Sequence, residues 1–398
     1  MKENLRHAAG SLLVVGLGGT ELTALERAWL RLVRPAGVIL FRRNIADARQ
    51  TRALIDDATA LCAPHSFCCV DVEGGTVDRL RDALAPMPSA QAVAEAARRS
   101  DRDAWSPTLS QRARKDGAPS FPRSQKRDHG HPTLLAREHG ELIARAVKAF
   151  GFNTTLAPVL DLALSPSAEV LGSRAAGATA ADVVEYARNF LAGLASQKVV
   201  GCGKHFPGLG GGSLDSHQET PAIHRNMREL WSEDLAPYRD LRNQLPMVMV
   251  NHAAYPDTPG KNRPASVSPY WITTVLRKRI GYRGIVFSDD LEMGGILKFM
   301  PIEEAAVAAI RAGMDLLEVC HTPEMILRAH EALIAEGERS AVFSKLLIAR
   351  ASETTRAQAR LFANSVPPAL AAKQFEALRK RILSFSERIM KAQEAQTA

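Results

Sequence analysis

The chain has 398 residues, of which 46% are hydrophobic and 24% are charged. These proportions are typical of a soluble globular protein and exclude a disordered, collagen-like or fibrous chain. Lysine and arginine number 51 against 43 acidic residues, which gives a formal net charge of +8. This mild excess allows an anionic substrate, but without clustered basic and aromatic residues it does not indicate nucleic-acid binding.

The five cysteines and the N-terminus indicate a cytoplasmic protein. The cysteines are odd in number, Cys68 and Cys69 are adjacent, and their spacing matches no zinc-binding pattern. We therefore expect reduced, buried thiols. The N-terminus has only a short apolar run and no cleavage signature. No apolar stretch approaches the ~20 residues that a membrane span needs, so we expect no membrane partner.

Eight short apolar runs alternate along the chain with segments of helical periodicity. The runs are continuous, as is typical of parallel strands that are buried on both faces. They occupy residues 11–17, 37–41, 67–72, 154–160, 199–206, 247–252, 285–288 and 314–319. The helical segments have apolar residues three and four apart and occupy residues 179–196, 227–242, 270–280 and 303–312.

This alternation predicts an α/β fold, a (β/α)₈ barrel of the TIM type. A doubly wound parallel sheet is the alternative. Polar residues follow nearly every apolar run, and barrel enzymes build their sites from the loops at the carboxyl ends of the strands. The sequence therefore favours the barrel.

Two segments fall outside the alternation. Residues 101–133 contain four prolines, seven lysines or arginines and little apolar periodicity, so we expect a mobile insertion. After two prolines, the apolar residues of the last segment recur at three- and four-residue spacing, which predicts one amphipathic helix packed on the barrel or on a second subunit. We assign residues 1–364 to a barrel domain and residues 365–398 to a C-terminal helix.

The densest group of titratable residues lies between residues 204 and 217. Lys204 and His205 end a buried run, and a glycine-rich stretch then leads to Asp215 and His217. Residues two apart in an extended segment face the same way, so Asp215 can polarise the His217 imidazole as a general acid/base. The alternatives are a solvated surface loop and a phosphate-binding loop, although the glycines lack the spacing of known phosphate cradles.

Asp289 and Asp290 end the seventh predicted strand. Because successive side chains alternate along a strand, we expect one of these carboxylates to face the barrel mouth as a nucleophile or a metal ligand. Capping of the next turn is the competing role for either residue. His205, His252 and Asp289 are candidate ligands for a metal, but the first strand lacks the histidines that such sites use. We expect no metal and no organic cofactor.

Several motifs occur in order from about residue 12 to about residue 313. The most specific are Lys-His-Phe-Pro-Gly at 204–208, Asp-Ser-His at 215–217 and Ser-Asp-Asp-Leu-Glu-Met at 288–293. Supporting motifs lie at 37–44, 70–79 and 264–268. Together they resemble glycoside hydrolase family 3, and within it the bacterial β-N-acetylhexosaminidases of the NagZ type.

The resemblance implies a barrel enzyme that removes terminal N-acetylglucosamine from β-linked glycosides with retention of configuration. Asp289 matches the family's nucleophile, His217 its acid/base and Asp215 the partner of that histidine. The family's sugar-binding positions match Asp71, Arg79, Arg174, Lys204 and His205. Single-barrel members are cytosolic and, in Gram-negative bacteria, act on anhydro-muropeptides, so the resemblance implies a small carbohydrate or cell-wall fragment as substrate.

Three departures from the family pattern leave the catalytic residues in place. Residues 209–211 read Leu-Gly-Gly where the family commonly has His-Gly-Asp, and Thr76 replaces an arginine. The segment around Arg174 lacks an aromatic residue that is often found there. These changes and the long insertion bear on the choice of leaving group.

The same residues allow other activities. A phosphorylase could use them, since a histidine repels an anionic acceptor less than a carboxylate does. A β-glucosidase usually takes its acid/base from another domain, and a substrate-assisted hydrolase would use Asp289 and Asp290 to orient the acetamido group. A silent sugar-binding protein has no physical need to keep Asp289, Asp215 and His217 together.

Overall fold

The computed structural model describes residues 2–104, 132–212, 221–362 and 369–394. At its centre lies a closed barrel of parallel strands in the order β1-β10-β9-β8-β7-β6-β3-β2. The strands are β1 (Leu13–Gly16), β2 (Gly37–Leu40), β3 (Phe67–Val70), β6 (Thr154–Thr155), β7 (Val200–Phe206), β8 (Met247–Val250), β9 (Ile285–Asp290) and β10 (Leu316–Val319). Each predicted apolar run supplies a barrel strand, which confirms the (β/α)₈ barrel and excludes the doubly wound sheet.

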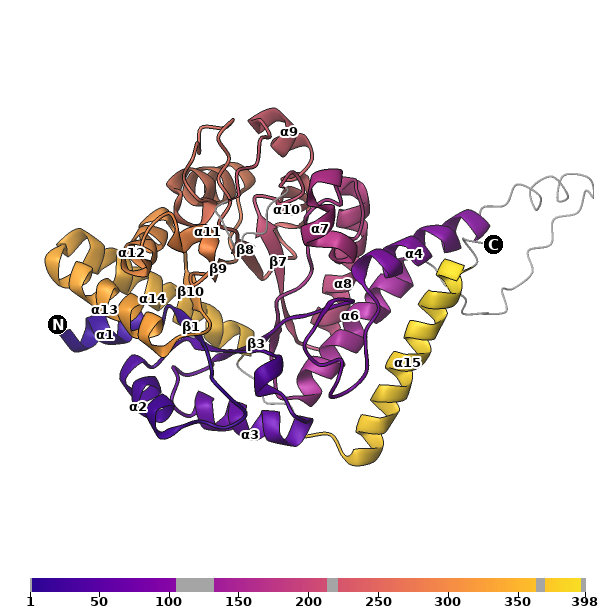
Figure 1. The fold of residues 1–398 in the computed structure, drawn as a ribbon, viewed down its shortest axis with the longest axis horizontal. Coiled ribbons are helices and arrows are strands. Elements are labelled where there is room, and N and C mark those ends of the chain that lie inside the picture. The colour runs from indigo at the N-terminus through magenta and orange to yellow at the C-terminus, as the bar shows by residue number, and fades with distance from the viewer. Residues whose placement is uncertain (1, 105–131, 213–220, 363–368, 395–398) are drawn as a thin grey trace, which may run out of the picture.

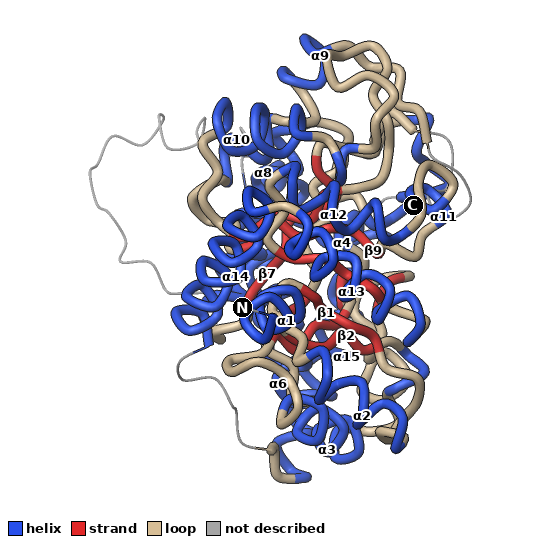
Figure 2. The backbone as a smooth tube through the Cα atoms, turned by 90° about the vertical axis from the view of Figure 1, so that its left-hand side faces the viewer, coloured by secondary structure: helices blue, strands red, loops and turns tan. Residues whose placement is uncertain are grey.

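Helices surround the strands (Figures 1 and 2). The main ones are α1 (Lys2–Gly10), α2 (Ala24–Val33), α3 (Ala48–Thr59), α4 (Ala90–Ala104), α6 (Pro132–Ala149), α8 (Ala180–Ser196), α9 (Met227–Ser232), α10 (Ala236–Leu241), the π-helix η5 (Tyr270–Ile280), α12 (Ile302–Ala312), α13 (Pro323–Arg339), α14 (Ala341–Phe362) and α15 (Ala372–Glu394). Shorter elements are η1 (Arg42–Asn44), β4 (Val72–Gly74), β5 (Val77–Asp78), η2 (Ser165–Ser167), α7 (Ala168–Leu171), η3 (Gly172–Arg174), η4 (Ala265–Val267) and α11 (Gly294–Leu297).

Local start and stop signals explain most helix boundaries. Pro301 occupies the N-cap of α12, and Gly313 ends that helix with a φ of 108°, a conformation that glycine adopts without a Cβ penalty. The expected single helix over 227–242 is instead two helices, α9 and α10. Pro237 lies in the first turn of α10, and its ring would clash with the carbonyl four residues earlier if one helix continued.

The barrel encloses a hydrophobic cluster that is separate from the cluster between strands and helices. Along β10, Leu316 and Cys320 belong to the inner cluster, whereas Leu317 and Val319 belong to the outer one. Phe362 of α14 packs edge-on against Phe67 with ring centroids 5.0 Å apart. Apolar packing therefore fills the amino-terminal end of the barrel, and the opposite end is left for the site.

The C-terminal helix α15 packs on α4 and α6 of the same chain, along the side of the barrel (Figure 1). Its predicted apolar stripe is buried at Leu378, Ile382, Phe385 and Ile389. This confirms the prediction that the apolar stripe packs on the barrel. The predicted boundary between residues 364 and 365 falls outside the described residues.

The insertion and the cysteines test two further expectations. Helix α4 runs to Ala104 and α6 begins at Pro132, so both ends of the predicted insertion 101–133 are helical. Residues 105–131, and with them the expected mobility, lie outside the described residues. All five cysteines are free and buried, as expected. No helix among the described residues has the length and apolar character of a membrane span.

Candidate active site

The barrel strands carry apolar side chains first and charged side chains last on their inner face. Every second residue of a strand points inward, and the inner cluster contains Cys69, Cys202, Phe287 and Leu316. In each case the residue two positions further along the chain is charged. These residues are, in the same order, Asp71, Lys204, Asp289 and Glu318. The period of the strand therefore places these four charged residues in one layer at the carboxyl end of the barrel, where barrel enzymes act.

This layer lines a cavity of about 550 Å³. The lining residues are Phe41, Asp71, Glu73, Val77, Arg79, Leu156, Glu169, Val170, Arg174, Lys204, His205, Leu209, Met249, Asp289, Asp290, Glu292, Met293, Glu318, Cys320 and His321. Every predicted catalytic or sugar-binding residue that the structure describes is among them, whereas the candidate metal ligand His252 is not. The predicted dyad of Asp215 and His217 lies in the stretch 213–220, outside the described residues.

Lys204 is the buried cation at the centre of the cavity wall. Its Nζ lies 2.9 Å from Asp71 Oδ1 and 2.7 Å from Glu73 Oε1, and 4% of the side chain is exposed. Burial alone would lower the pKa of Lys204, but the carboxylates of Asp71 and Glu73 raise it above its usual value. Lys204 is therefore charged at neutral pH and holds two carboxylates in fixed positions.

Glu73 joins Lys204 to Arg174. Arg174 donates from Nε to Glu73 Oε2 at 2.8 Å and from Nη2 to Oε1 at 2.9 Å. This bidentate ion pair fixes the orientation of both the guanidinium and the carboxylate plane. Burial raises the pKa of Glu73, but Arg174 and Lys204 outweigh it and lower that pKa well below the usual range. Sequence reasoning missed Glu73 as a site residue, although it stands two residues after Asp71 at the same strand end.

Asp161 orients His205. Its Oδ2 lies 2.6 Å from His205 Nδ1, and its Oδ1 accepts from the backbone N–H of Leu209 at 2.7 Å. Arg174 Nη2 lies 3.4 Å from the other ring nitrogen, Nε2. His205 is thus held between Asp161 at Nδ1 and Arg174 at Nε2, and Asp161 is a second residue that sequence reasoning did not assign to the site.

Asp289 is a carboxylate that its neighbours keep ionised. Burial raises its pKa, but His205, His252 and Lys204 together lower it below the usual range. One of its oxygens, Oδ1, accepts from the backbone N–H of Asp290 at 3.0 Å. An ionised, half-buried carboxylate in a sugar-sized cavity has the state that a nucleophile requires.

Asp290 corrects the expectation that only one of the two aspartates faces the barrel mouth. Both line the cavity, because the pairing of β9 with β10 shifts register between Leu316 and Glu318. Asp290 Oδ1 accepts from the backbone N–H groups of Glu292 at 3.1 Å and Cys320 at 3.2 Å. Asp290 therefore has the turn-capping role, which leaves Asp289 as the candidate for chemistry.

His252 is engaged by the protein on both ring nitrogens. Its Nε2 donates to the Asp290 carbonyl oxygen at 2.9 Å, and its Nδ1 lies 2.7 Å from Ser266 Oγ. Burial lowers the pKa of His252. Within the described part of the chain, no group of three or more His, Cys, Asp or Glu side chains is arranged to hold a metal ion. The geometry thus gives no support to the proposed metal ligation by His205, His252 and Asp289.

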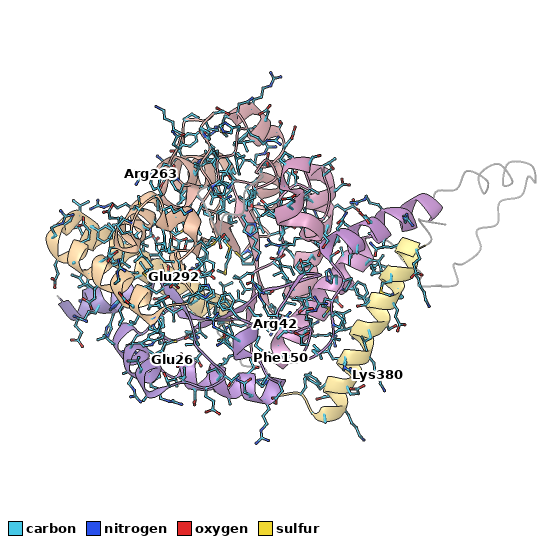
Figure 3. The ribbon with its side chains drawn as sticks, viewed as in Figure 1. Glu26, Arg42, Phe150, Arg263, Glu292 and Lys380 are labelled. Atoms are coloured by element: carbon cyan, nitrogen blue, oxygen red, sulfur yellow. The ribbon has the colours of Figure 1, made fainter. Side chains whose placement is uncertain are left out.

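An aromatic wall forms the rim of the cavity. Phe41 and His321 stack with ring centroids 5.5 Å apart, and Arg43 lies 4.7 Å above the Phe41 ring. His321 Nε2 lies 3.2 Å from Asp290 Oδ2, and Glu292, labelled in Figure 3, accepts from the backbone N–H of Thr322 at 3.2 Å. Arg79 completes the predicted set, with its Nη2 3.8 Å from Asp71 Oδ2.

The sequence matches known proteins over most of its length. The N-terminal domain of glycosyl hydrolase family 3 matches residues 5–347. The β-hexosaminidase of Alkalilimnicola ehrlichii is 36% identical over 315 residues, which cover 79% of this chain and 82% of that protein. The β-hexosaminidase of Methylococcus capsulatus is 35% identical over 319 residues, which cover 80% of this chain and 85% of that protein.

Solved structures share the same barrel. A glycoside hydrolase family 3 β-N-acetylglucosaminidase from Paenibacillus sp. FPU-7 has a TM-score of 0.80 at 28% identity, with 96% of this chain and 68% of that chain covered. Native NagZ from Neisseria gonorrhoeae has a TM-score of 0.70 at 27% identity, with 96% of this chain and 97% of that chain covered. These similarities agree with the ordered motifs of the sequence.

Proposed function

The chain belongs to glycosyl hydrolase family 3, and we propose that it is a retaining exo-β-N-acetylglucosaminidase acting on β-linked glycosides of the cell-wall muropeptide class. The observation that carries this proposal is Asp289, a half-buried carboxylate of the cavity whose pKa is lowered by its neighbours although desolvation raises it. The relatives named β-hexosaminidase support the choice of an N-acetylated sugar.

In the proposed first step, an Asp289 carboxylate oxygen attacks the anomeric carbon and the bond to the leaving oxygen breaks. His217, polarised by Asp215, gives its proton to that oxygen, so the leaving group departs as an alcohol. The sugar is then an ester of Asp289. In the second step water attacks the same carbon, His217 takes its proton, and the Asp289 carboxylate leaves. Two inversions give net retention.

The charged wall supplies the groups that bind the sugar in this proposal. Arg79, Arg174 and Lys204 donate to sugar hydroxyl oxygens, and Asp71 accepts from hydroxyl groups. Hydrogen bonds to charged partners contribute about 1.5–3 kcal/mol each, and Lys204 and Arg174 are already fixed by Glu73. A site fixed before the substrate arrives loses less freedom on binding. Burial of this wall within a closed barrel suits a terminal sugar rather than the middle of a chain.

The test is turnover of an aryl β-N-acetylglucosaminide and the matching β-glucoside by wild type, Asp289→Ala and a control. We expect the N-acetyl substrate to be preferred and Asp289→Ala to lose activity by at least about a thousandfold, as loss of a nucleophile does elsewhere. Asp57→Ala removes an exposed carboxylate that pairs with Arg27 at 2.6 Å and should keep wild-type rates.

The outcomes separate the alternatives. Surviving activity in Asp289→Ala would remove the proposed nucleophile, and preference for the glucoside would keep the nucleophile but overturn the specificity. Product analysis in phosphate buffer then distinguishes hydrolysis from phosphorolysis: free sugar supports the hydrolase, whereas sugar 1-phosphate identifies a phosphorylase. A mechanism-based fluorosugar should label the peptide that contains Asp289, and its failure to do so would favour a substrate-assisted route.

A further inference from the structure

The cavity contains one carboxyl group that the steps above do not use. Glu318 points inward from β10, where its backbone pairs with Asp290 of β9, and it lines the cavity. Only 4% of the residue is exposed. Its Oε1 accepts from Cys320 Sγ at 2.9 Å, and its Oε2 is buried without a hydrogen-bond partner.

Glu318 differs from the other buried carboxylates of the cavity in having no cation beside it. Glu73 is paired with both Arg174 and Lys204, and Asp71 is paired with Lys204. Of the groups that interact with Glu318, Cys320 lies on its own strand. The groups on other strands are Asp290 and Asp289 from β9, Asp71 beyond β3, Cys69 from β3 and Cys202 from β7. These neighbours are carboxyl groups and thiols, and within the described chain Glu318 forms no ion pair, so the Cys320 thiol is the group seen to favour a negative charge on it.

We propose that Glu318 is a positioning residue for Asp289: it stays a neutral carboxylic acid, so that the two groups together carry a single negative charge, located on Asp289. The proposal rests on the function proposed above only in taking Asp289 as the nucleophile. Like charges in a buried site cannot both ionise cheaply, and the groups that stabilise an anion in this cavity, Lys204 and His205, act on Asp289.

The electrostatics agree with this assignment of the proton. Burial raises the pKa of Glu318, and the carboxylates of Asp290, Asp289 and Asp71 raise it further, while the thiol of Cys320 opposes them. The two environments thus push the pKa values of Glu318 and Asp289 in opposite directions. Asp289 and Glu318 thus form a coupled pair that shares one proton, and this proton resides on Glu318.

The charge of Asp289 should therefore govern the proton of Glu318. When Asp289 becomes a neutral ester in the glycosyl-enzyme, Glu318 loses one of the anions that face it, and its proton is held less tightly. Replacement of Asp289 by Asn imitates this loss of charge without any reaction. Coupling of two groups is reciprocal, whereas a purely structural glutamic acid would not respond to the charge at residue 289.

The first experiment measures the infrared carbonyl band of protonated carboxylic acids as a function of pH. We expect wild type at pH 7 to show a band that Glu318→Gln lacks and that Glu303→Gln retains, because Glu303 is a partly exposed, ion-paired partner of Arg328. In Asp289→Asn the same band should disappear at a lower pH than in wild type. This readout needs no turnover, so it remains valid if the proposed activity fails.

The second experiment compares the pH dependence of kcat/KM. Gln cannot ionise, so Glu318→Gln should keep the acid limb of wild type and stay within about threefold of its rate at pH 6, as expected when no contact to the transition state is lost. Its alkaline limb should extend to higher pH. Absence of the wild-type band at pH 7, or a band that titrates identically in wild type and Asp289→Asn, would overturn the proposal. An alkaline limb that Glu318→Gln leaves unchanged would also overturn it.

Discussion

At the scale of single residues, the cavity is organised by pairs of opposite charges that would be costly to bury alone. Glu73 is 3% exposed and lies between Arg174 and Lys204. Removing one partner of a buried ion pair leaves an uncompensated charge and costs about 3–5 kcal/mol. Glu73 thus supports the proposed sugar-binding wall through the two cations rather than by contact with the reacting atoms.

We expect Glu73→Gln to lower the free energy of unfolding at pH 7 by about 3 kcal/mol, because Arg174 loses its carboxylate partner. Since Arg174 and Lys204 are then held less firmly, KM should rise more than kcat falls. Urea unfolding and steady-state kinetics measure both. Glu303→Gln, which breaks the partly exposed pair with Arg328, is the control and should cost less than about 1 kcal/mol.

The same variant has a pH signature. The folded pKa of Glu73 lies below the ordinary glutamate value of 4.5, so its ionised form stabilises the fold above pH ~4.5 and this contribution is lost as the pH falls further. The stability difference between wild type and Glu73→Gln should therefore be constant from about pH 6 to pH 8 and shrink below pH ~4.5. A difference that stays constant at pH 3.5 would contradict the assigned pairing.

At the scale of elements, continuous apolar runs predicted every barrel strand because both faces of such strands are buried. The break between α9 and α10 was missed, although Pro237 was a visible signal for it. The pairing of Asp161 with His205 could not be read from the sequence, since Asp161 follows β6 and His205 lies on the neighbouring β7, and the two meet only when the barrel closes. Asp289 and Asp290 both line the cavity because the pairing of β9 with β10 shifts register. The spacing of apolar residues in the sequence gives no sign of such a shift.

Closure of the barrel depends on a close approach of β1 to β10 directly beneath the site. A Cβ at Gly16 would lie 1.8 Å from the carbonyl oxygen of Cys320, so Gly16→Ala must push apart the two strands. We expect a loss of about 1–3 kcal/mol in unfolding free energy, and a fall in kcat/KM because Glu318 and His321 flank Cys320. Gly19→Ala meets nothing within 4 Å and is the matched control. Equal free energies of unfolding for Gly16→Ala and Gly19→Ala would show that β10 moves aside without destabilising the fold.

At the scale of the whole molecule, α15 contributes to the fold without reaching the site. The cavity-lining residues of the described chain come from strand ends, loops and the short helices α7 and η3, and none belongs to α15. Phe385 stacks on His139 at a centroid distance of 5.9 Å, and His139 in turn lies 3.0 Å from the Tyr186 hydroxyl. The helix therefore joins α6 and α8 into one packed layer on the outside of the barrel.

We expect a substitution in this layer to lower the stability of the fold without changing the activity of the folded protein. Phe385 is fully buried, so Phe385→Ala should lower the free energy of unfolding by about 3–5 kcal/mol through lost burial and the cavity left behind. Below the unfolding transition its kcat and KM should stay at wild-type values, because α15 contributes no residue to the lining of the cavity. Met390→Ala, at a side chain that is 55% exposed, should change neither quantity. A fall in kcat of folded Phe385→Ala, measured by active-site titration to count native molecules, would instead show that the outer layer controls the geometry of Arg174, which lies in η3 against α4.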